Sequence, residues 1–244
     1  MTTLKIATYN IHKGFSQFNR RMVLHELREK LRGLDADIVF LQEVQGEHES
    51  HALRHADYPA AQQHEFLADE FWAHHAYGMN AMYEAGHHGN AILSRFPILQ
   101  TRNNDVSAHR FEQRGLLHCE IDFNGRSVHC FCVHFGLFGK GRRAQVQALI
   151  AHVRNEVPAD ALLVIAGDFN DWRNQLSREL AGELDVYDAF HLGHGKHARS
   201  FPASFPLFKL DRIYVRGFDV VECHVHGGRR MSDHAALLAQ LKRK

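Results

Sequence analysis

Residues 162–170 read Leu-Leu-Val-Ile-Ala-Gly-Asp-Phe-Asn, and this stretch decides how the rest of the sequence is interpreted. The apolar run Leu162–Ala166 predicts a buried strand, and polar residues follow it directly. Asp168 and Asn170 are two positions apart, so extended backbone would point both side chains to the same side. The stretch therefore predicts a carboxylate and an amide that a rigid strand presents together.

Polar residues border three further apolar runs in the same way. Asn10 follows the run Leu4–Tyr9, Glu43 follows Ile38–Leu41, and Asp233 precedes the last run together with His234. Each motif alone is weak, because Asp or Asn beside a strand is commonly a turn former or a helix cap. Together they predict that several strands deliver their polar ends to one crevice.

The apolar runs alternate with helical patterns, which is typical of an α/β or α+β protein. Asn124-Gly125 lies between two of the runs and accepts the positive φ angles of a type I′ turn, so it predicts a β-hairpin. Strands are expected at Leu4–Tyr9, Ile38–Leu41, Ala91–Ser94, Leu116–Phe123, Ser127–Phe135, Leu162–Ala166, Arg212–Val215, Val220–Val225 and Ala235–Leu241.

Three helices are expected where apolar residues recur on one face. The first is capped by Asn19 and continues through Leu31, the second lies near Gln63–Trp72, and the third covers about Arg142–Val157. The segment Gly193–Lys209 has no period and predicts a long surface loop, a kind of segment that is often functional.

Composition limits the class of protein. A chain of 244 residues with 45% hydrophobic content can bury one large core, so we expect a single domain, residues 1–244. With 29 basic and 28 acidic residues there is no global positive field that would draw polyanions. No secretory signal or membrane span is evident, and the four cysteines lack a C-x-x-C pair, so we expect a monomeric, cytoplasmic protein with reduced thiols.

The polar residues match the needs of phosphoester hydrolysis. A hard cation needs carboxylate oxygen, which Glu43 can supply. The attacking water needs an acceptor that orients and deprotonates it, and Asp168 is the candidate. Charge that builds on the phosphoryl oxygens needs donors such as the Asn170 amide and an imidazole.

The ordered set of motifs resembles the endonuclease/exonuclease/phosphatase superfamily, which includes DNase I, and the resemblance covers nearly the whole chain. Asn-Ile-His-Lys-Gly at 10–14 is similar to a group of small bacterial members. The resemblance implies a four-layer sandwich, in which two mixed β-sheets pack face to face with helices on both outer faces. The motifs are Tyr9-Asn10, Leu41-Gln42-Glu43, Gly89 to Arg95, Val133-His134, Gly167 to Asn170, Leu210 to Ile213 and Ser232-Asp233-His234.

The resemblance also implies roles on the metal side of the site. Glu43 would bind Mg²⁺ or Mn²⁺, and Asn10 would assist through the neighbouring hydrogen bonds. Asp233 would support the metal and the last histidine. Asp168 would position the nucleophilic water.

The same resemblance assigns the phosphate side. Asn170 and His134 would contact phosphate oxygens, and His234 would bind phosphate or carry a proton. Asp188, in the segment Asp-Ala-Phe, would orient His234, while Asp211 would lie near the site in a mainly structural role.

Substrate contacts are less defined by the sequence. Asn90 would touch the substrate through its amide or else form a turn before its strand. Arg114, with Arg142 and Arg143, would bind phosphate bidentately or remain a solvated charge. His88 is expected to be a surface turn residue.

Three functions remain open. The first is a phosphodiesterase acting on a lipid head group or another small phosphoester. The second is a nuclease, which needs a basic strip and aromatic side chains that stack on bases, with Trp172, Phe201, Phe205 and Phe208 as candidates. The third is a catalytically inert binding module. Abasic DNA is disfavoured because abasic-site nucleases carry an acidic residue at the place of His12 and a tyrosine at the place of His134.

Overall fold

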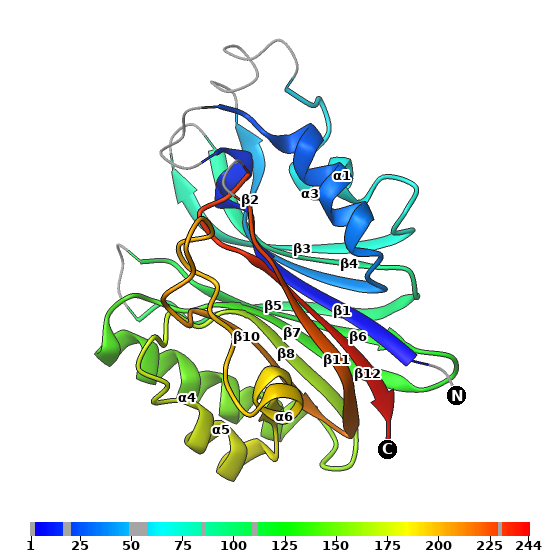
Figure 1. Cartoon of the computed structure of the whole chain (residues 1–244), viewed down its shortest axis with the longest axis vertical. Coiled ribbons are helices and arrows are strands. Elements are labelled where there is room, and N and C mark those ends of the chain that lie inside the picture. The colour runs from blue at the N-terminus through cyan, green and yellow to red at the C-terminus, as the bar shows by residue number, and fades with distance from the viewer. Residues whose placement is uncertain (1–2, 17–20, 49–57, 84–85, 109–111, 229–230) are drawn as a thin grey trace.

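The structure, a computed structural model, describes residues 3–16, 21–48, 58–83, 86–108, 112–228 and 231–244. Two six-stranded sheets pack face to face, and helices cover their outer faces (Figure 1). The predicted four-layer sandwich is therefore confirmed.

The first sheet has the strand order β11-β12-β1-β2-β4-β3. Only β1 and β2 are parallel, and all other neighbours are antiparallel. Because β12 lies beside β1, the two ends of the chain meet in one sheet. The strands are β1 (Thr3–Asn10), β2 (Ile38–His48), β3 (His74–Tyr83), β4 (Gly86–Ser94), β11 (Phe218–His226) and β12 (Ala236–Arg243).

The second sheet has the order β5-β6-β7-β8-β10-β9, and here only β7 and β8 are parallel. Asn124 and Gly125 both have positive φ angles in the turn between β6 and β7, so the predicted hairpin is confirmed. The strands are β5 (Ile98–Asp105), β6 (Gly115–Asp122), β7 (Ser127–His134), β8 (Leu162–Asp168), β9 (Tyr187–Asp188) and β10 (Asp211–Arg216).

The core between the sheets consists of apolar side chains from both inner faces, among them Ile6, Phe40, Ile121 and Val164. On the outer face of the first sheet, α1 and α3 bury a second cluster, and on the second sheet α4 and α5 bury a third. A short helix, α6, contacts β10 and β11. The helices are α1 (Leu24–Leu34), α3 (Gln63–Ala68), α4 (Gly139–Glu156), α5 (Ser177–Leu184) and α6 (Ala189–His194).

Several expected boundaries differ from the structure. Asn19 lies outside the described residues, and α1 begins at Leu24. The helix expected to end at Trp72 ends at Ala68, where Asp69 takes a positive φ angle. Strand β5 was not expected because nearly all of its side chains are exposed at a sheet edge, so it lacks an apolar signal.

No helix among the described residues is long and apolar enough to cross a membrane. The four cysteines are buried and free, as the sequence predicted.

Candidate active site

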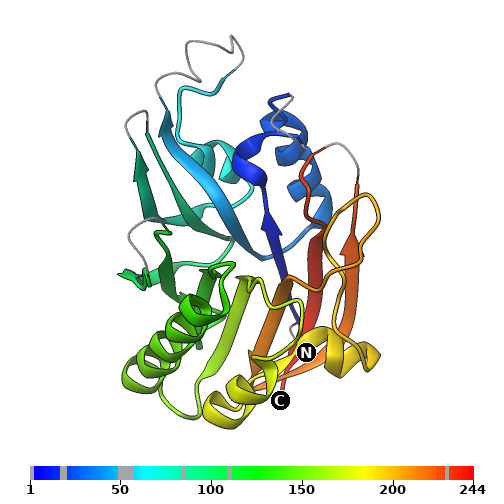
Figure 2. The same ribbon diagram turned by 90° about the vertical axis from the view of Figure 1, so that its left-hand side faces the viewer.

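Four polar side chains stand at the same end of the sandwich because of strand direction and register. Asn10 ends β1, while His134 and Asp168 end the parallel strands β7 and β8 as register partners. Asp211 begins β10 and pairs with Asp168 in antiparallel register. Figure 2 turns this end of the strands toward the reader.

Unusual backbone conformations shape this end of both sheets. Glu43 has a φ of 56° and lies where the β2–β4 register shifts, so a β-bulge re-aims its side chain. Gly167 has a φ of 147°, and a Cβ atom there would lie 1.9 Å from the carbonyl oxygen of Val133. Unusual backbone conformations of this kind are common at functional sites, where neighbouring structure holds them in place.

The Asp168 carboxylate is the centre of the arrangement. Its Oδ2 accepts a hydrogen bond from Asn10 Nδ2 at 3.2 Å and lies 3.6 Å from His134 Nε2 and 3.8 Å from His234 Nε2. Its Oδ1 accepts from the backbone N–H of Asn170 at 3.0 Å. Burial raises the pKa of Asp168 to about 6, although His234 acts in the opposite direction. Four chain segments thus meet at one carboxylate.

His234 is oriented by Asp211, and the predicted partner Asp188 is wrong. His234 Nδ1 lies 2.8 Å from Asp211 Oδ2, and both side chains are buried. Burial alone would lower the pKa of His234, but the carboxylates of Asp211, Asp168 and Asp233 outweigh it and raise the pKa to about 10. His234 is therefore an imidazolium near neutral pH.

Asp188 holds a different part of the fold. It caps α6 by accepting hydrogen bonds from the backbone N–H groups of Phe190 and His191. Its Oδ2 lies 3.2 Å from Arg212 Nε and 2.8 Å from His197 Nδ1. A carboxylate engaged in a helix cap and a buried ion pair is not available to His234.

His134 and Asn170 lie beside Asp168. Burial, with a smaller effect of the Arg114 charge, lowers the pKa of His134 well below its ordinary value, so this imidazole is neutral. Asn170 has a φ of 50°, a left-handed conformation that asparagine tolerates. Its amide donates to the carbonyl oxygen of Phe135 at 2.9 Å, which ties the loop after β7 to the loop after β8.

Two further carboxylates, Glu43 and Asp233, lie beside Asn10 and His12, respectively. The Asn10 amide nitrogen lies 3.4 Å from Glu43 Oε1, so this one nitrogen links the Glu43 and Asp168 carboxylates. The Asn10 side-chain oxygen accepts a hydrogen bond from the backbone N–H of His12 at 3.1 Å. Asp233 Oδ1 lies 3.4 Å from His12 Nδ1.

The donor set fits a hard divalent cation, because carboxylate oxygens dominate it. Among the described residues, Asp168, Asp211 and His234 also offer ligand atoms within 4.8 Å of one another. An imidazolium has no free lone pair, however, and His234 Nδ1 is already bonded to Asp211. Glu43 and Asp233 add two further carboxylates to this donor set.

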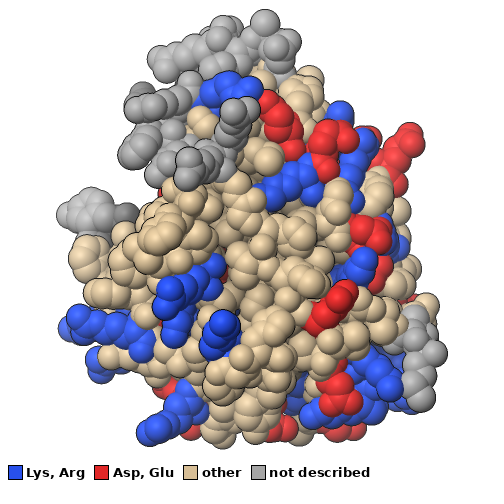
Figure 3. Space-filling model, viewed as in Figure 1, with Lys and Arg blue, Asp and Glu red and all other residues tan. Residues whose placement is uncertain are grey.

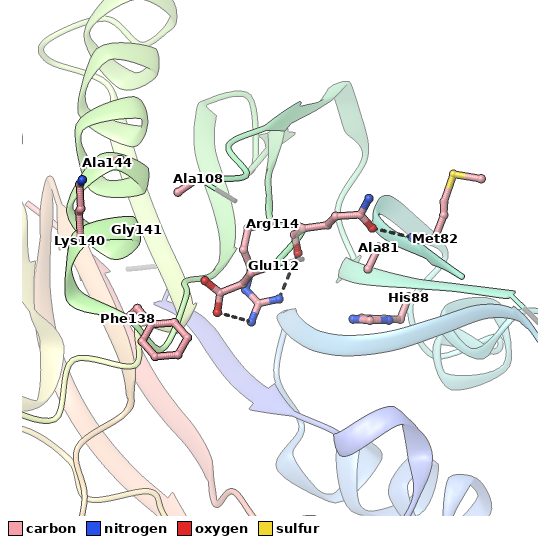
Figure 4. A pocket seen from close by; sticks show the side chains of 11 residues that line it. Ala81, Met82, His88, Ala108, Glu112, Arg114, Phe138, Lys140, Gly141 and Ala144 are labelled. Atoms are coloured by element: carbon pink, nitrogen blue, oxygen red, sulfur yellow. Dashed lines mark hydrogen bonds and ion pairs between the residues drawn. The ribbon is translucent and has the colours of Figure 1, made fainter. Parts of the chain in front are cut away.

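Two predicted substrate contacts differ in outcome. Asn90 is completely buried inside β4, where its amide donates to the carbonyl oxygens of Gly115 and Cys132, so the structure gives it neither a substrate contact nor a turn. It joins the two sheets behind the site. Arg114 instead lines a cavity of about 980 Å³ and pairs with Glu112 at 3.6 Å (Figure 4).

His88 also lines this cavity and belongs to β4, so its expected turn position is wrong. Burial lowers its pKa to about 4. In Figure 4, Met82 and Phe138 lie on opposite sides of the Arg114 guanidinium.

Two residues that support His234, Ser232 and Phe201, were not predicted to do so from the sequence. Ser232 Oγ donates to the carbonyl oxygen of Asn10 at 2.7 Å and accepts from the His234 N–H at 3.1 Å, which joins the first and last parts of the chain. The ring of Phe201 packs 5.1 Å from the His234 ring. For Ser232 the Ser-Asp-His motif was a signal in the sequence. For Phe201 there was none, because it reaches the site from a loop without a periodic pattern.

A model of the Endonuclease/Exonuclease/phosphatase family matches residues 7–234, which include every residue of this site. The chain belongs to that family. Family members are phosphoester hydrolases, and the site described above agrees with this class of enzyme.

Relatives and solved structures extend the match. The chain is 46% identical over 244 residues to the uncharacterized protein YbhP of Escherichia coli K12, covering 98% of this chain and 96% of that protein. An endonuclease/exonuclease/phosphatase from Beutenbergia cavernae is 21% identical, with a TM-score of 0.81 over 99% of this chain and 72% of that one. TDP2 of D. rerio, solved with a single strand DNA product, is 19% identical, with a TM-score of 0.71 over 99% of this chain and 100% of that one. The two solved structures support the fold.

Proposed function

We propose that the protein is a divalent-metal-dependent phosphodiesterase that uses in-line attack of an activated water. The observation that carries this proposal is the convergence on Asp168 of one amide and two imidazoles, one of them neutral and one protonated. This arrangement provides a base for water and donors for phosphoryl oxygens around one point.

Asp168 is the acceptor for the nucleophilic water. Its carboxylate is ionised at neutral pH, and Asn10 and the Asn170 backbone N–H fix its position. A base with a pKa near 6 combines a large ionised fraction with a useful affinity for a proton.

His234 and His134 would interact with the phosphate in different ways. The imidazolium of His234, held by Asp211, can stabilise anionic oxygen and donate a proton from Nε2. His134 is neutral and can donate one hydrogen bond without adding charge. The remaining N–H of the Asn170 amide is a further donor.

Glu43 and Asp233 would hold the cation, which we propose to be Mg²⁺ or Mn²⁺. A cation bound there supplies positive charge that favours attack on phosphorus and departure of the leaving oxygen. Asn10 positions the Glu43 carboxylate by its hydrogen bond.

The substrate would extend from the phosphate position into the cavity lined by Arg114. A volume of about 980 Å³ accommodates a group the size of a lipid head group or a nucleotide. A nuclease is the second candidate, because the similar structure of D. rerio TDP2 holds a single strand DNA product.

A metal-free preparation of the full chain tests the proposal. Chelator treatment should abolish hydrolysis of bis(p-nitrophenyl) phosphate, and Mg²⁺ or Mn²⁺ should restore it. Phospholipid, inositol phosphate and plasmid DNA substrates assayed in parallel distinguish a phosphodiesterase of lipid head groups or small phosphoesters from a nuclease. Activity that chelator leaves untouched would contradict the proposed function.

A further inference from the structure

Exposed apolar side chains lie in the segments that follow the site residues and beside the Arg114 cavity. On one side Leu137 and Phe138, in the loop after β7, are 66% and 76% exposed. On the other side Trp172 follows the Asp168 loop, and Phe205 is 70% exposed at the end of the hairpin 201–208. Met82 completes the group beside the Arg114 cavity. We call these five residues the apolar rim.

The loop that presents Leu137 and Phe138 is held rigidly. The backbone N–H of Gly136 donates to Gln145 Oε1 at 2.8 Å, and that of Leu137 donates to Glu112 Oε1 at 3.1 Å. The buried Arg142 donates to the carbonyl oxygens of both residues. Because four polar contacts fix its backbone, this loop keeps two apolar side chains exposed to solvent.

The opposite side of the rim is anchored as well. Ala203 donates its N–H to the carbonyl oxygen of Asp233 at 2.6 Å, so the hairpin 201–208 is tied to the site. The rings of Trp172 and Phe208 lie 6.0 Å apart and support each other. Large apolar groups that a fixed backbone exposes together are typical of an interaction surface.

Cations accompany the apolar rim on both sides. Lys140 and Arg143 are exposed in the first turns of α4, directly after Phe138. The Arg173 guanidinium lies 4.8 Å from the Trp172 ring centroid, and Lys209 follows Phe208. None of these four cations forms an ion pair within the described residues. Figure 3 shows Lys and Arg, with few acidic groups, where Figure 1 places α4 and α5.

We infer that the apolar rim docks the protein on an anionic lipid surface, with the Arg114 cavity facing the head groups. Aromatic and aliphatic side chains enter the boundary between head groups and acyl chains, while the cations bind lipid phosphates. The consequence that the substrate is a membrane phospholipid rests on the proposed function, whereas the docking itself does not.

Two other binding partners, a nucleic acid and a second copy of the chain, fit the apolar rim less well. Bases of a nucleic acid stack on flat rings, and Leu137 and Met82 offer no ring. A second copy of the chain would bring two cationic rims together, and like charges would oppose that contact. A bilayer surface can contact the whole apolar rim at once, and the cations attract it.

Vesicle sedimentation with the full chain tests the inference. The wild type should sediment with phosphatidylcholine vesicles that contain phosphatidylglycerol, and added salt should weaken this binding. The variant Leu137→Ser/Phe205→Ser alters both sides of the rim and leaves the Arg114 cavity intact. Its partition coefficient should fall at least about tenfold.

The matched control is Leu99→Ser/Leu192→Ser, which changes side chains that are 55% and 50% exposed on β5 and α6. It should bind vesicles like the wild type. The inference is overturned if the wild type does not sediment with anionic vesicles, if both variants lose binding equally, or if the rim variant binds like the wild type. It is also overturned if the rim variant loses affinity for a single-stranded oligonucleotide while vesicle binding is unchanged.

Hydrolysis of soluble bis(p-nitrophenyl) phosphate separates this inference from the proposed function. The rim variant should keep the wild-type rate, because neither altered side chain lines the site. Loss of vesicle binding with full soluble activity supports the docking surface. A wild type that sediments with vesicles but hydrolyses nothing would refute the function and leave the docking intact.

Discussion

His234 Nδ1 lies 2.8 Å from Asp211 Oδ2, and the opposite ring nitrogen of His234 faces Asp168 at 3.8 Å. The imidazole therefore spans two carboxylates on neighbouring strands of the second sheet. Asp211 fixes the ring and raises its pKa, and in the proposed mechanism Asp168 accepts the proton of the attacking water. The proposed chemistry depends on this division of work between the two aspartates.

Asp211→Asn should lower kcat at least about 100-fold, because the amide neither holds the ring in one orientation nor favours the imidazolium. A positioning role also predicts a changed pH dependence of kcat, which a purely structural residue would not cause. Asp211→Glu should restore part of the rate. An unchanged pH profile in Asp211→Asn would argue against this role.

Asp188→Ala should reduce stability and leave kcat nearly unchanged, in contrast to Asp211→Asn. The change removes the cap of α6 and leaves the buried Arg212 without its carboxylate, so the free energy of unfolding should fall by about 3 kcal/mol. Below the melting transition, kcat should stay within about threefold of the wild type, because Asp188 contacts no reacting group. Urea unfolding and steady-state kinetics measure the two quantities. A large kcat loss at full stability would reinstate Asp188 as a catalytic partner.

Glu43→Gln should raise the Mg²⁺ or Mn²⁺ concentration for half-maximal activity by at least about tenfold, since the amide supplies no negative charge. The expected cause is weaker metal binding, which calorimetric titration of Mn²⁺ can measure directly. Glu222→Gln, a change on the exposed face of β11, is the control. Equal metal requirements in the two variants would remove Glu43 from the metal site.

Stability should fall as the solution is acidified, because buried histidines must become charged. Burial lowers the pKa of His118 to about 3 and that of His64 to about 4, against 6.5 for the free side chain. Each folded-state pKa lies below its unfolded value. The stabilisation is therefore complete above pH 6.5 and is lost as the pH falls toward the folded-state values.

His118→Gln should flatten this dependence by up to about 1.4 kcal/mol per pH unit. His118 stacks on Phe131 and contacts His129 and His152, so the variant should start from a lower stability. The slope of stability against pH is therefore the quantity to compare. Unfolding by urea at a series of pH values measures it. Parallel curves for the two proteins would show that His118 does not titrate on unfolding.

Much of the fold could be predicted because its central strands are apolar. The strand β8 has a buried, nearly continuous apolar sequence, and Asn124-Gly125 locally specifies the turn between β6 and β7. Strand β5 could not be predicted, because its residues face solvent at a sheet edge and only pairing with β6 makes it a strand.

Part of the site could also be predicted, namely the residues at the ends of apolar strands. The ends of β1, β7 and β8 placed Asn10, His134 and Asp168 correctly, since strand direction alone brings such ends together. The partner of His234 was not predictable from local sequence. Asp211 reaches it through the register between β10 and β8, which depends on packing of the whole sheet.

Hydrolysis of bis(p-nitrophenyl) phosphate in ¹⁸O-enriched water, by the metal-loaded wild type and by Asp168→Asn, tests the central claim most directly. Water activated at Asp168 should place one ¹⁸O atom in p-nitrophenyl phosphate and none in p-nitrophenol. Asp168→Asn should react at least about 100-fold more slowly. Label in p-nitrophenol, or a wild-type rate in the variant, would contradict the account.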